Sequence, residues 1–320
     1  MNSIPRVSPQ ARDYIDRVLS YGFHNTTSPG ITAKLEALFA RTFGVRYAMA
    51  MANGTVTLHA ALVAAGVGAG DEVIVPPLTA GATGIVVLHV NAVPVFADID
   101  PDTLTIDPED VRRKITPRTK AIIPVAIYGL APDLDPIMET ARERSLTVIE
   151  DDAQCFLGSY KGRLVGSIGH FASFSFQASK HMTCGDGGIL ITDNEELATK
   201  ARRVSSFGYA SASSRPGASV MPEAQRCAPD AVRHVSLGYN FRLPEIAAAV
   251  ALGELERLEE LVAMRTTVAE CLAEVIDACD WLVPQKTPPG YVNSFWTYTV
   301  RIARDDVDWA AFRRKFVELG

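Results

Sequence analysis

Short apolar runs alternate with amphipathic segments along the first 150 residues. Runs that are apolar throughout are typical of strands buried on both faces, and apolar residues at helical spacing between them predict helices. The predicted strands are 47–51, 72–75, 94–97, 121–125 and 147–149, and the predicted helices are 55–65, 79–90, 108–115 and 135–144. This order predicts an α/β fold in which helices cover both faces of a mostly parallel sheet.

The ends of the chain depart from this alternation. Further helices are predicted over 8–20, from 31 onward, over 244–265 and over 309–319, with a helical stretch that ends near 278. A further strand is predicted over 296–302, and loops over 22–30 and 208–234. A polar loop as long as 208–234 is usually functional or mobile. We expect two domains: a large α/β domain over 1–245 and a smaller α+β domain over 246–320.

Composition and charge narrow the class of protein. A hydrophobic content of 48% and a charged content of 21% over 320 residues are typical of a globular protein with a sizeable core. A net charge of −6 without a basic block does not suggest a nucleic-acid or membrane partner. The five cysteines show no CxxC spacing, which argues against disulfides and zinc. Prolines interrupt the most apolar region, 73–97, and no signal peptide is evident, so we expect a cytoplasmic protein.

One lysine stands between an apolar, strand-like run and a predicted strand over 189–192. Lys180 lies in SFSFQASKHMTCGDGG, and the seven residues before it carry no charge. Burial among apolar groups lowers the pKa of an ammonium and makes the amine a nucleophile toward carbonyls. A surface lysine that extends its charged end into water would fit the same local sequence.

Two other strand ends carry candidate chemistry, because ligands of parallel sheets bind beyond the carboxyl ends of the strands. Gly54 and Thr55 follow the first strand and open a helix, whose free N–H groups suit a phosphate; a plain helix cap fits equally well. Glu150-Asp151-Asp152-Ala153-Gln154 follows the fifth strand. Three adjacent carboxylates suit a cationic group, with a solvated acidic turn or a divalent metal as alternatives.

An amine, a carboxylate and a phosphate cradle together fit pyridoxal 5′-phosphate. Its aldehyde suits Lys180, its ring nitrogen suits a carboxylate, and its phosphate suits the helix start.

The six histidines share no metal-ligand spacing, so no metal is expected.

Eight ordered runs resemble the DegT/DnrJ/EryC1/StrS family of sugar aminotransferases over nearly the whole chain. They are NGTVTLHAAL, GAGDEVIVPPLT, PVFADIDPDTLTIDP, PRTKAIIPVAIYG, VIEDDAQ, YKGRLVGSIG, FSFQASKHMTCGDGG and GYNFRLPE. The resemblance implies the fold-type-I architecture of pyridoxal phosphate enzymes. It also implies transfer of an amino group, usually from glutamate, to a keto group of a nucleotide-linked sugar.

The resemblance also implies roles for single residues. Lys180 would form the internal aldimine and move the proton between substrate and cofactor, and Asp151 would pair with the pyridinium nitrogen. Gln154 would lie beside the ring near its hydroxyl. The implied phosphate ligands are Gly54, Thr55, Ser175 and, from the neighbouring subunit of a homodimer, Asn240.

Two features depart from the family pattern. Ala80 stands where many members place an aromatic residue against the cofactor ring, so we expect the contact to be lost or supplied by Leu78 or another segment. Members normally continue for several tens of residues after the position of Gly320, so we expect this sequence to be a fragment. The alternatives to a sugar aminotransferase are a cyclitol aminotransferase, a sugar dehydratase, which Lys180 argues against because family dehydratases carry histidine there, and a non-catalytic regulatory relative.

Overall fold

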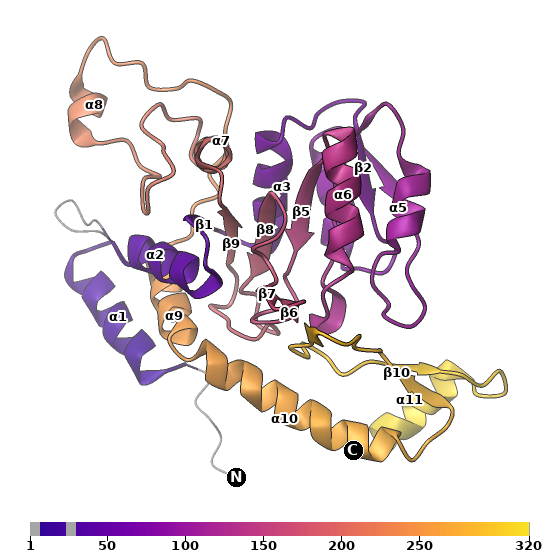
Figure 1. Cartoon of the computed structure of the whole chain (residues 1–320). Helices are drawn as coiled ribbons and strands as arrows, with labels where there is room; N and C mark the ends of the chain where they lie inside the picture. The colour runs from indigo at the N-terminus through magenta and orange to yellow at the C-terminus, as the bar shows by residue number, and fades with distance from the viewer. Residues whose placement is uncertain (1–6, 24–29, 320) are drawn as a thin grey trace.

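The computed structural model describes residues 7–23 and 30–319, so most of the predicted loop over 22–30 lies outside the described residues. Its centre is a seven-stranded sheet (Figure 1). In spatial order the strands are β1 (Tyr47–Met51), β9 (Gly188–Thr192), β8 (Phe171–Ser175), β5 (Thr147–Asp151), β4 (Thr119–Ile122), β2 (Glu72–Val75) and β3 (Val93–Phe96). Strand β9 is antiparallel to both β1 and β8, and the pairs from β8 to β3 are parallel. The predicted mostly parallel α/β sheet is confirmed.

Helices cover both faces of this sheet, because alternate strand residues are apolar on opposite sides. On one face, the helices α3 (Gly54–Ala64), α4 (Gly81–His89) and α7 (Glu195–Ser205) pack over side chains such as Met49, Val75 and Leu190. On the other face lie α2 (Ile31–Phe43) and α9 (Glu245–Leu255), with α5 (Pro108–Lys114) and α6 (Leu134–Arg144) farther along.

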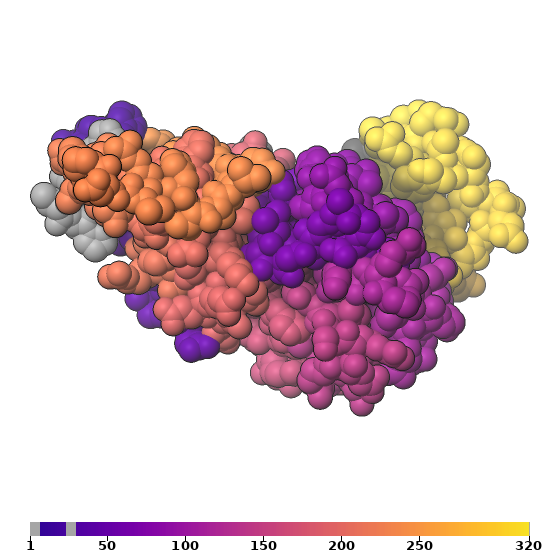
Figure 2. All heavy atoms as spheres, turned by 90° about the horizontal axis from the view of Figure 1, so that it is seen from above, coloured from indigo at the N-terminus to yellow at the C-terminus, as the bar shows by residue number. Residues whose placement is uncertain are grey.

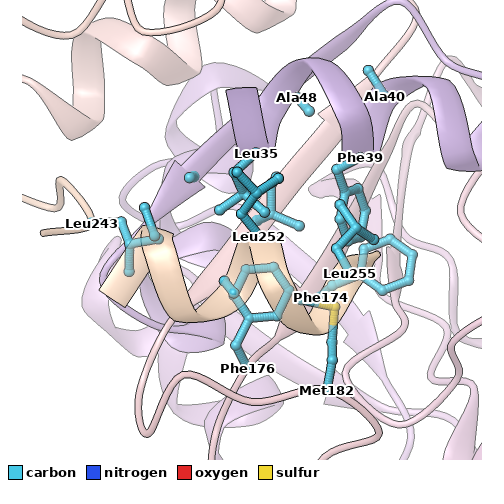
Figure 3. Close-up of a cluster of buried hydrophobic side chains, with 14 of the residues drawn as sticks. Leu35, Phe39, Ala40, Ala48, Phe174, Phe176, Met182, Leu243, Leu252 and Leu255 are labelled. Atoms are coloured by element: carbon cyan, nitrogen blue, oxygen red, sulfur yellow. The ribbon is translucent and has the colours of Figure 1, made fainter. Parts of the chain in front are cut away.

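Two helices far apart in sequence form the largest buried cluster on that second face. Figure 3 shows Leu35 and Phe39 of α2 facing Leu252 and Leu255 of α9, with Phe174 of β8 among them. The N-terminal helix α1 (Pro9–Ser20) is capped by Ser8, whose hydroxyl accepts the Ala11 N–H, and packs on α9. Because α9 packs on both α1 and α2, the chain after residue 245 starts inside the body formed by the central sheet and its helices.

The prediction of one continuous helix over 244–265 is wrong, because this segment contains two helices. The chain forms α9, breaks at Glu256–Arg257, and restarts as α10 (Leu258–Ile276). At the break the Arg257 guanidinium lies 2.7 Å from the Glu254 carboxylate. Both helices have apolar residues at helical spacing, so the pattern alone does not reveal a change of direction that tertiary packing imposes.

The C-terminal part contains a two-stranded sheet of its own and pairs with the body through one short strand. After α10, β10 (Leu282–Pro284) pairs with β12 (Val300–Ile302), and α11 (Trp309–Glu318) follows. In the sequence between β10 and β12 lies β11 (Tyr291–Val292), which pairs with β6 (Ser159–Tyr160) of the body. Strand β6 also pairs with β7 (Arg163–Leu164). Figure 2 shows the last residues as a lobe at one end of the molecule.

Two other predictions about elements need correction. The predicted strand over 296–302 is shorter, because residues 296–299 are irregular and only Val300–Ile302 pairs in a sheet. The long polar loop over 208–234 contains one short helix, α8 (Glu223–Cys227). In the parts of the chain that the structure describes, no helix is both long enough and apolar enough to cross a bilayer.

Candidate active site

A cleft of about 470 Å³ opens at the carboxyl ends of β5 and β8, beside the start of α3. Its lining residues are Asn53, Gly54, Thr55, Leu58, Ala80, Ala82, Asp151, Ala153, Ser175, Gln177, Lys180 and Asp186. Five of the predicted site residues thus share one cleft. This is the position at which parallel sheets bind ligands, because helix starts and strand ends meet there.

The start of α3 forms one wall of the cleft. Asn53 caps the helix by accepting a hydrogen bond from the Val56 N–H at 3.0 Å. Gly54 packs directly on Ser175, since a Cβ on Gly54 would lie 2.9 Å from the Ser175 Cβ. The N–H groups of the first helical turn have no acceptor farther back in the helix, and the positive end of the helix dipole attracts anions. With the hydroxyls of Thr55 and Ser175, this wall suits a phosphate.

Asp151 forms the floor of the cleft. Its carboxylate accepts hydrogen bonds from the Thr83 hydroxyl at 2.8 Å and from the Ala153 N–H at 3.3 Å. Burial raises the pKa of Asp151, while these two hydrogen bonds and the nearby charge of Lys180 lower it. A buried carboxylate with few donors is stabilised by a cation, so Asp151 suits a protonated ring nitrogen.

The three adjacent carboxylates are buried and do not form a solvated turn. Glu150 and Asp151 lie inside β5, so their side chains point to opposite faces of the sheet. Glu150 accepts backbone N–H groups of Gly166, Ile168 and Gly169. Among the described residues no group hydrogen-bonds to Asp152 Oδ2. Burial, followed by the charges of Glu150 and Asp151, raises the pKa of Asp152 well above the ordinary value.

Lys180 faces Asp151 across the cleft from a loop without regular structure. Phe176 and Met182, on either side of this loop, are fully buried in the cluster of Figure 3. Burial lowers the pKa of the Lys180 ammonium, the Asp151 charge raises it and Arg265 lowers it, with a net lowering. A lysine with a lowered pKa has more of the neutral amine that attacks a carbonyl. The surface-lysine alternative does not fit this half-buried position.

Two predicted residues lie outside the cleft. The Gln154 side chain is buried, and its Oε1 accepts the Tyr128 N–H at 2.8 Å. Asn240 is exposed, and its backbone pairs with Ser206. Its assignment to a neighbouring subunit therefore stays a prediction.

Among the lining residues that sequence reasoning missed are two polar ones near Lys180, Gln177 and Asp186. Both lie in the irregular segments around Lys180, where no periodicity indicates which side chains face the ligand. Their closeness to Lys180 in the sequence was the available signal. Ala80 lines the cleft as expected, whereas Leu78, the suggested replacement for the aromatic contact, is not one of the described lining residues.

The residues present fit pyridoxal phosphate. One cleft holds an amine with a lowered pKa, a buried carboxylate with two hydrogen-bond donors, and a helix start with two hydroxyls. Among the described residues there is no group of three or more histidine, cysteine or acidic side chains placed to hold a metal ion.

Comparisons with known proteins agree with this fit. The model of the DegT/DnrJ/EryC1/StrS aminotransferase family matches residues 8–318. A GDP-perosamine synthase of Caulobacter vibrioides is 37% identical over 313 residues, which cover 94% of this chain and 79% of that protein.

Solved structures give the same result. An aminotransferase from Psychrobacter cryohalolentis is 32% identical, with a TM-score of 0.87 over 99% of this chain and 82% of that one. DesV of S. venezuelae, solved with a ketimine intermediate, is also 32% identical, with a TM-score of 0.81 over 92% of this chain and 74% of its own.

Proposed function

The chain belongs to the DegT/DnrJ/EryC1/StrS aminotransferase family, and we propose that it moves an amino group from glutamate to a keto group of a nucleotide-linked sugar. The observation that carries this proposal is Lys180 facing Asp151 across a cleft that a helix start also lines. The similarity to a GDP-perosamine synthase favours a GDP-linked sugar as the substrate.

Pyridoxal phosphate, when bound, supplies an aldehyde that condenses with amines and a ring that accepts electrons from the adjacent carbon. The start of α3, with Thr55 and Ser175, would hold its phosphate. Asp151 would hold a proton on the ring nitrogen, and Thr83 keeps the Asp151 carboxylate oriented. Lys180 Nζ would bind the aldehyde carbon of the cofactor. Once the substrate amine has replaced it there, the Lys180 amine would move a proton at the amine-bearing carbon of the substrate.

The reverse reaction gives a direct test. Protein loaded with pyridoxal phosphate is mixed with GDP-perosamine and 2-oxoglutarate, and the release of glutamate is measured. We expect Lys180→Ala to abolish glutamate release, and Lys200→Ala, which removes a lysine outside the cleft, to leave it unchanged. The proposal is wrong if the loaded wild-type protein releases no glutamate from GDP-perosamine or from other nucleotide-linked amino sugars.

We also propose that two chains share their active sites as a homodimer. Leu237 and Tyr239, beside the exposed Asn240, are 95% and 47% exposed, which is unusual for large apolar side chains that have no partner. A mixture of Lys180→Ala and Asn240→Ala chains tests this arrangement. If Asn240 serves the partner's site, heterodimers contain one intact site, and activity returns on mixing; no recovery would contradict sharing.

A further inference from the structure

The backbone around Lys180 accepts hydrogen bonds from side chains of the C-terminal part of the chain. The guanidinium of Arg265, on α10, donates hydrogen bonds to the carbonyl oxygens of Ser179 at 2.8 Å and Lys180 at 3.1 Å. Its other terminal nitrogen donates to the Trp296 carbonyl at 2.6 Å. One side chain therefore joins three segments: the lysine loop, α10 and the irregular segment before β12.

Trp296 holds the same loop in two further ways. Its indole N–H donates to the Ser179 carbonyl at 2.9 Å, so this oxygen accepts from both Trp296 and Arg265. The Lys180 Nζ lies 4.2 Å from the centre of the indole ring, a distance at which a cation is attracted to the ring face. Trp296 thus contacts both the backbone beside Lys180 and the ammonium itself.

The lysine loop needs these contacts because it has no regular structure of its own. Residues 178–182 belong to no helix or strand, and the Lys180 N–H bonds only locally, to the Gln177 carbonyl at 2.9 Å. The carbonyl oxygens of Ser179 and Lys180 therefore depend on distant donors. Phe176 and Met182 hold the two ends of the loop by apolar burial. Between these ends the loop is held by Arg265 and Trp296 and by the buried His181, whose Nε2 lies 2.8 Å from the Ser294 carbonyl oxygen.

We propose that Arg265 and Trp296 are positioning residues that fix the Lys180 amine at the cleft from the C-terminal part of the chain. The Arg265 guanidinium fixes the backbone on either side of the Lys180 Cα. The indole ring of Trp296 attracts the Lys180 ammonium by a cation–π contact when the amine is not bound to a ligand. Arginine suits this role because its planar, always charged group donates to several carbonyl oxygens in fixed directions. Their effect on catalysis rests on the role proposed above for Lys180.

Hydrogen–deuterium exchange of the full chain tests the positioning without any cofactor. In Arg265→Met and Trp296→Leu, exchange of the peptide over 176–184 is expected to rise about tenfold, the effect of losing one charge-assisted hydrogen bond. Protection of β8 (Phe171–Ser175) should stay unchanged. Arg301→Met, which removes an exposed arginine from the same part of the chain, should leave both peptides unchanged. Wild-type exchange of the loop in both test variants would overturn the proposal.

Covalent capture tests the consequence for the amine. Full chain freed of cofactor is mixed with pyridoxal phosphate and reduced with borohydride at timed intervals, and the modified Lys180 peptide is quantified by mass spectrometry. Arg265→Met and Trp296→Leu are expected to slow capture about tenfold, since a mobile amine spends less time in reactive geometry. Trp296→Phe, which keeps a ring face but loses the N–H, should lie between them and wild type, and Trp309→Leu, at an indole that is 63% exposed, should match wild type.

The outcomes separate this inference from the proposed function. A wild-type chain that never links Lys180 to the cofactor would contradict the proposed function, while the exchange experiment would still decide the positioning. A chain that links normally in wild type and equally fast in Arg265→Met and Trp296→Leu would contradict the positioning alone. Melting temperatures measured alongside identify a general loss of folding, which would slow capture in every buried variant and raise exchange in β8 as well.

Discussion

A fully buried ion pair, Glu36 with Arg202, offers a test of how the helices are held to the central sheet. The two side chains are 0% and 1% exposed, and their groups meet at 2.6 and 2.9 Å in a two-pronged contact between α2 and α7. The Glu36 carboxylate also accepts the N–H groups of Ala50 and Gly217 at 2.8 and 2.7 Å. The pair thus ties together two helices, strand β1 and the long polar loop.

The magnitude follows from what each substitution leaves behind. Arg202→Met leaves a buried carboxylate with two backbone donors and no counter-charge, which is expected to lower the free energy of unfolding by about 3–5 kcal/mol. Glu36→Gln alone leaves an uncompensated guanidinium, with a cost of about 3 kcal/mol. In the Arg202→Met background the same Glu36→Gln change removes the unpaired charge, so it should stabilise the protein by about 1 kcal/mol or more.

Urea unfolding followed by tryptophan fluorescence measures all four variants of this cycle. Lys200→Met is the control, because its partner contact with Glu196 at 2.8 Å lies on the same helix but between side chains that are 49% and 75% exposed. The Lys200→Met substitution should change the free energy of unfolding by no more than about 0.5 kcal/mol. If Glu36→Gln has the same cost in both backgrounds, the burial of charge is not what makes the pair important, and the reasoning fails.

Three further predictions concern single carboxylates. Asp151→Asn should slow amine transfer from glutamate about a hundredfold, measured by single-turnover absorbance, because an amide does not hold a proton on the ring nitrogen; an unchanged rate would contradict its role. The pKa of Asp152 is raised by burial, so the wild type loses stability as the pH rises above the unfolded pKa, and Asp152→Ala should raise the melting temperature more at high pH than at low pH. Hydrogen bonding to Lys161 lowers the pKa of Asp135 to about 2, so its contribution is present above pH 3.8 and lost as the pH falls toward 2. Asp135→Asn should therefore melt below wild type at neutral pH and approach it in acid; a gap that does not close would contradict the assignment.

The parts of the fold that the sequence predicted are those set by local pattern. Apolar runs bounded by turn residues placed the strands of the sheet within a few residues, because a strand buried on both faces has few alternatives. Gly54, Asp151 and Ser175 could be found because each lies at a strand end, and parallel strand ends converge. The site was therefore predictable as far as it is built from the sheet.

The parts that escaped prediction depend on contacts between distant residues. The break at Glu256–Arg257 separates two segments with the same periodicity, and only packing of α9 on α1 and α2 distinguishes them. The hydrogen bond that Gln154 Oε1 accepts from the Tyr128 N–H joins residues 26 positions apart, and no local pattern indicates it. The position of Gln177 and Asp186 follows from loop geometry, for which the sequence has no periodic signal.

The strand pattern at 296–302 failed for a reason that bears on function. Its alternation of apolar and polar residues is typical of a strand, but Trp296 uses its indole N–H and its carbonyl for the Lys180 loop and Arg265 instead of a neighbouring strand. A segment recruited to a site gives up its ladder hydrogen bonds, and local propensity is then overridden. The surroundings of the Lys180 amine thus come from two parts of the chain. Burial at the cleft lowers its pKa and Asp151 raises it, while Arg265 of the C-terminal part lowers it and donates a hydrogen bond to the Lys180 carbonyl.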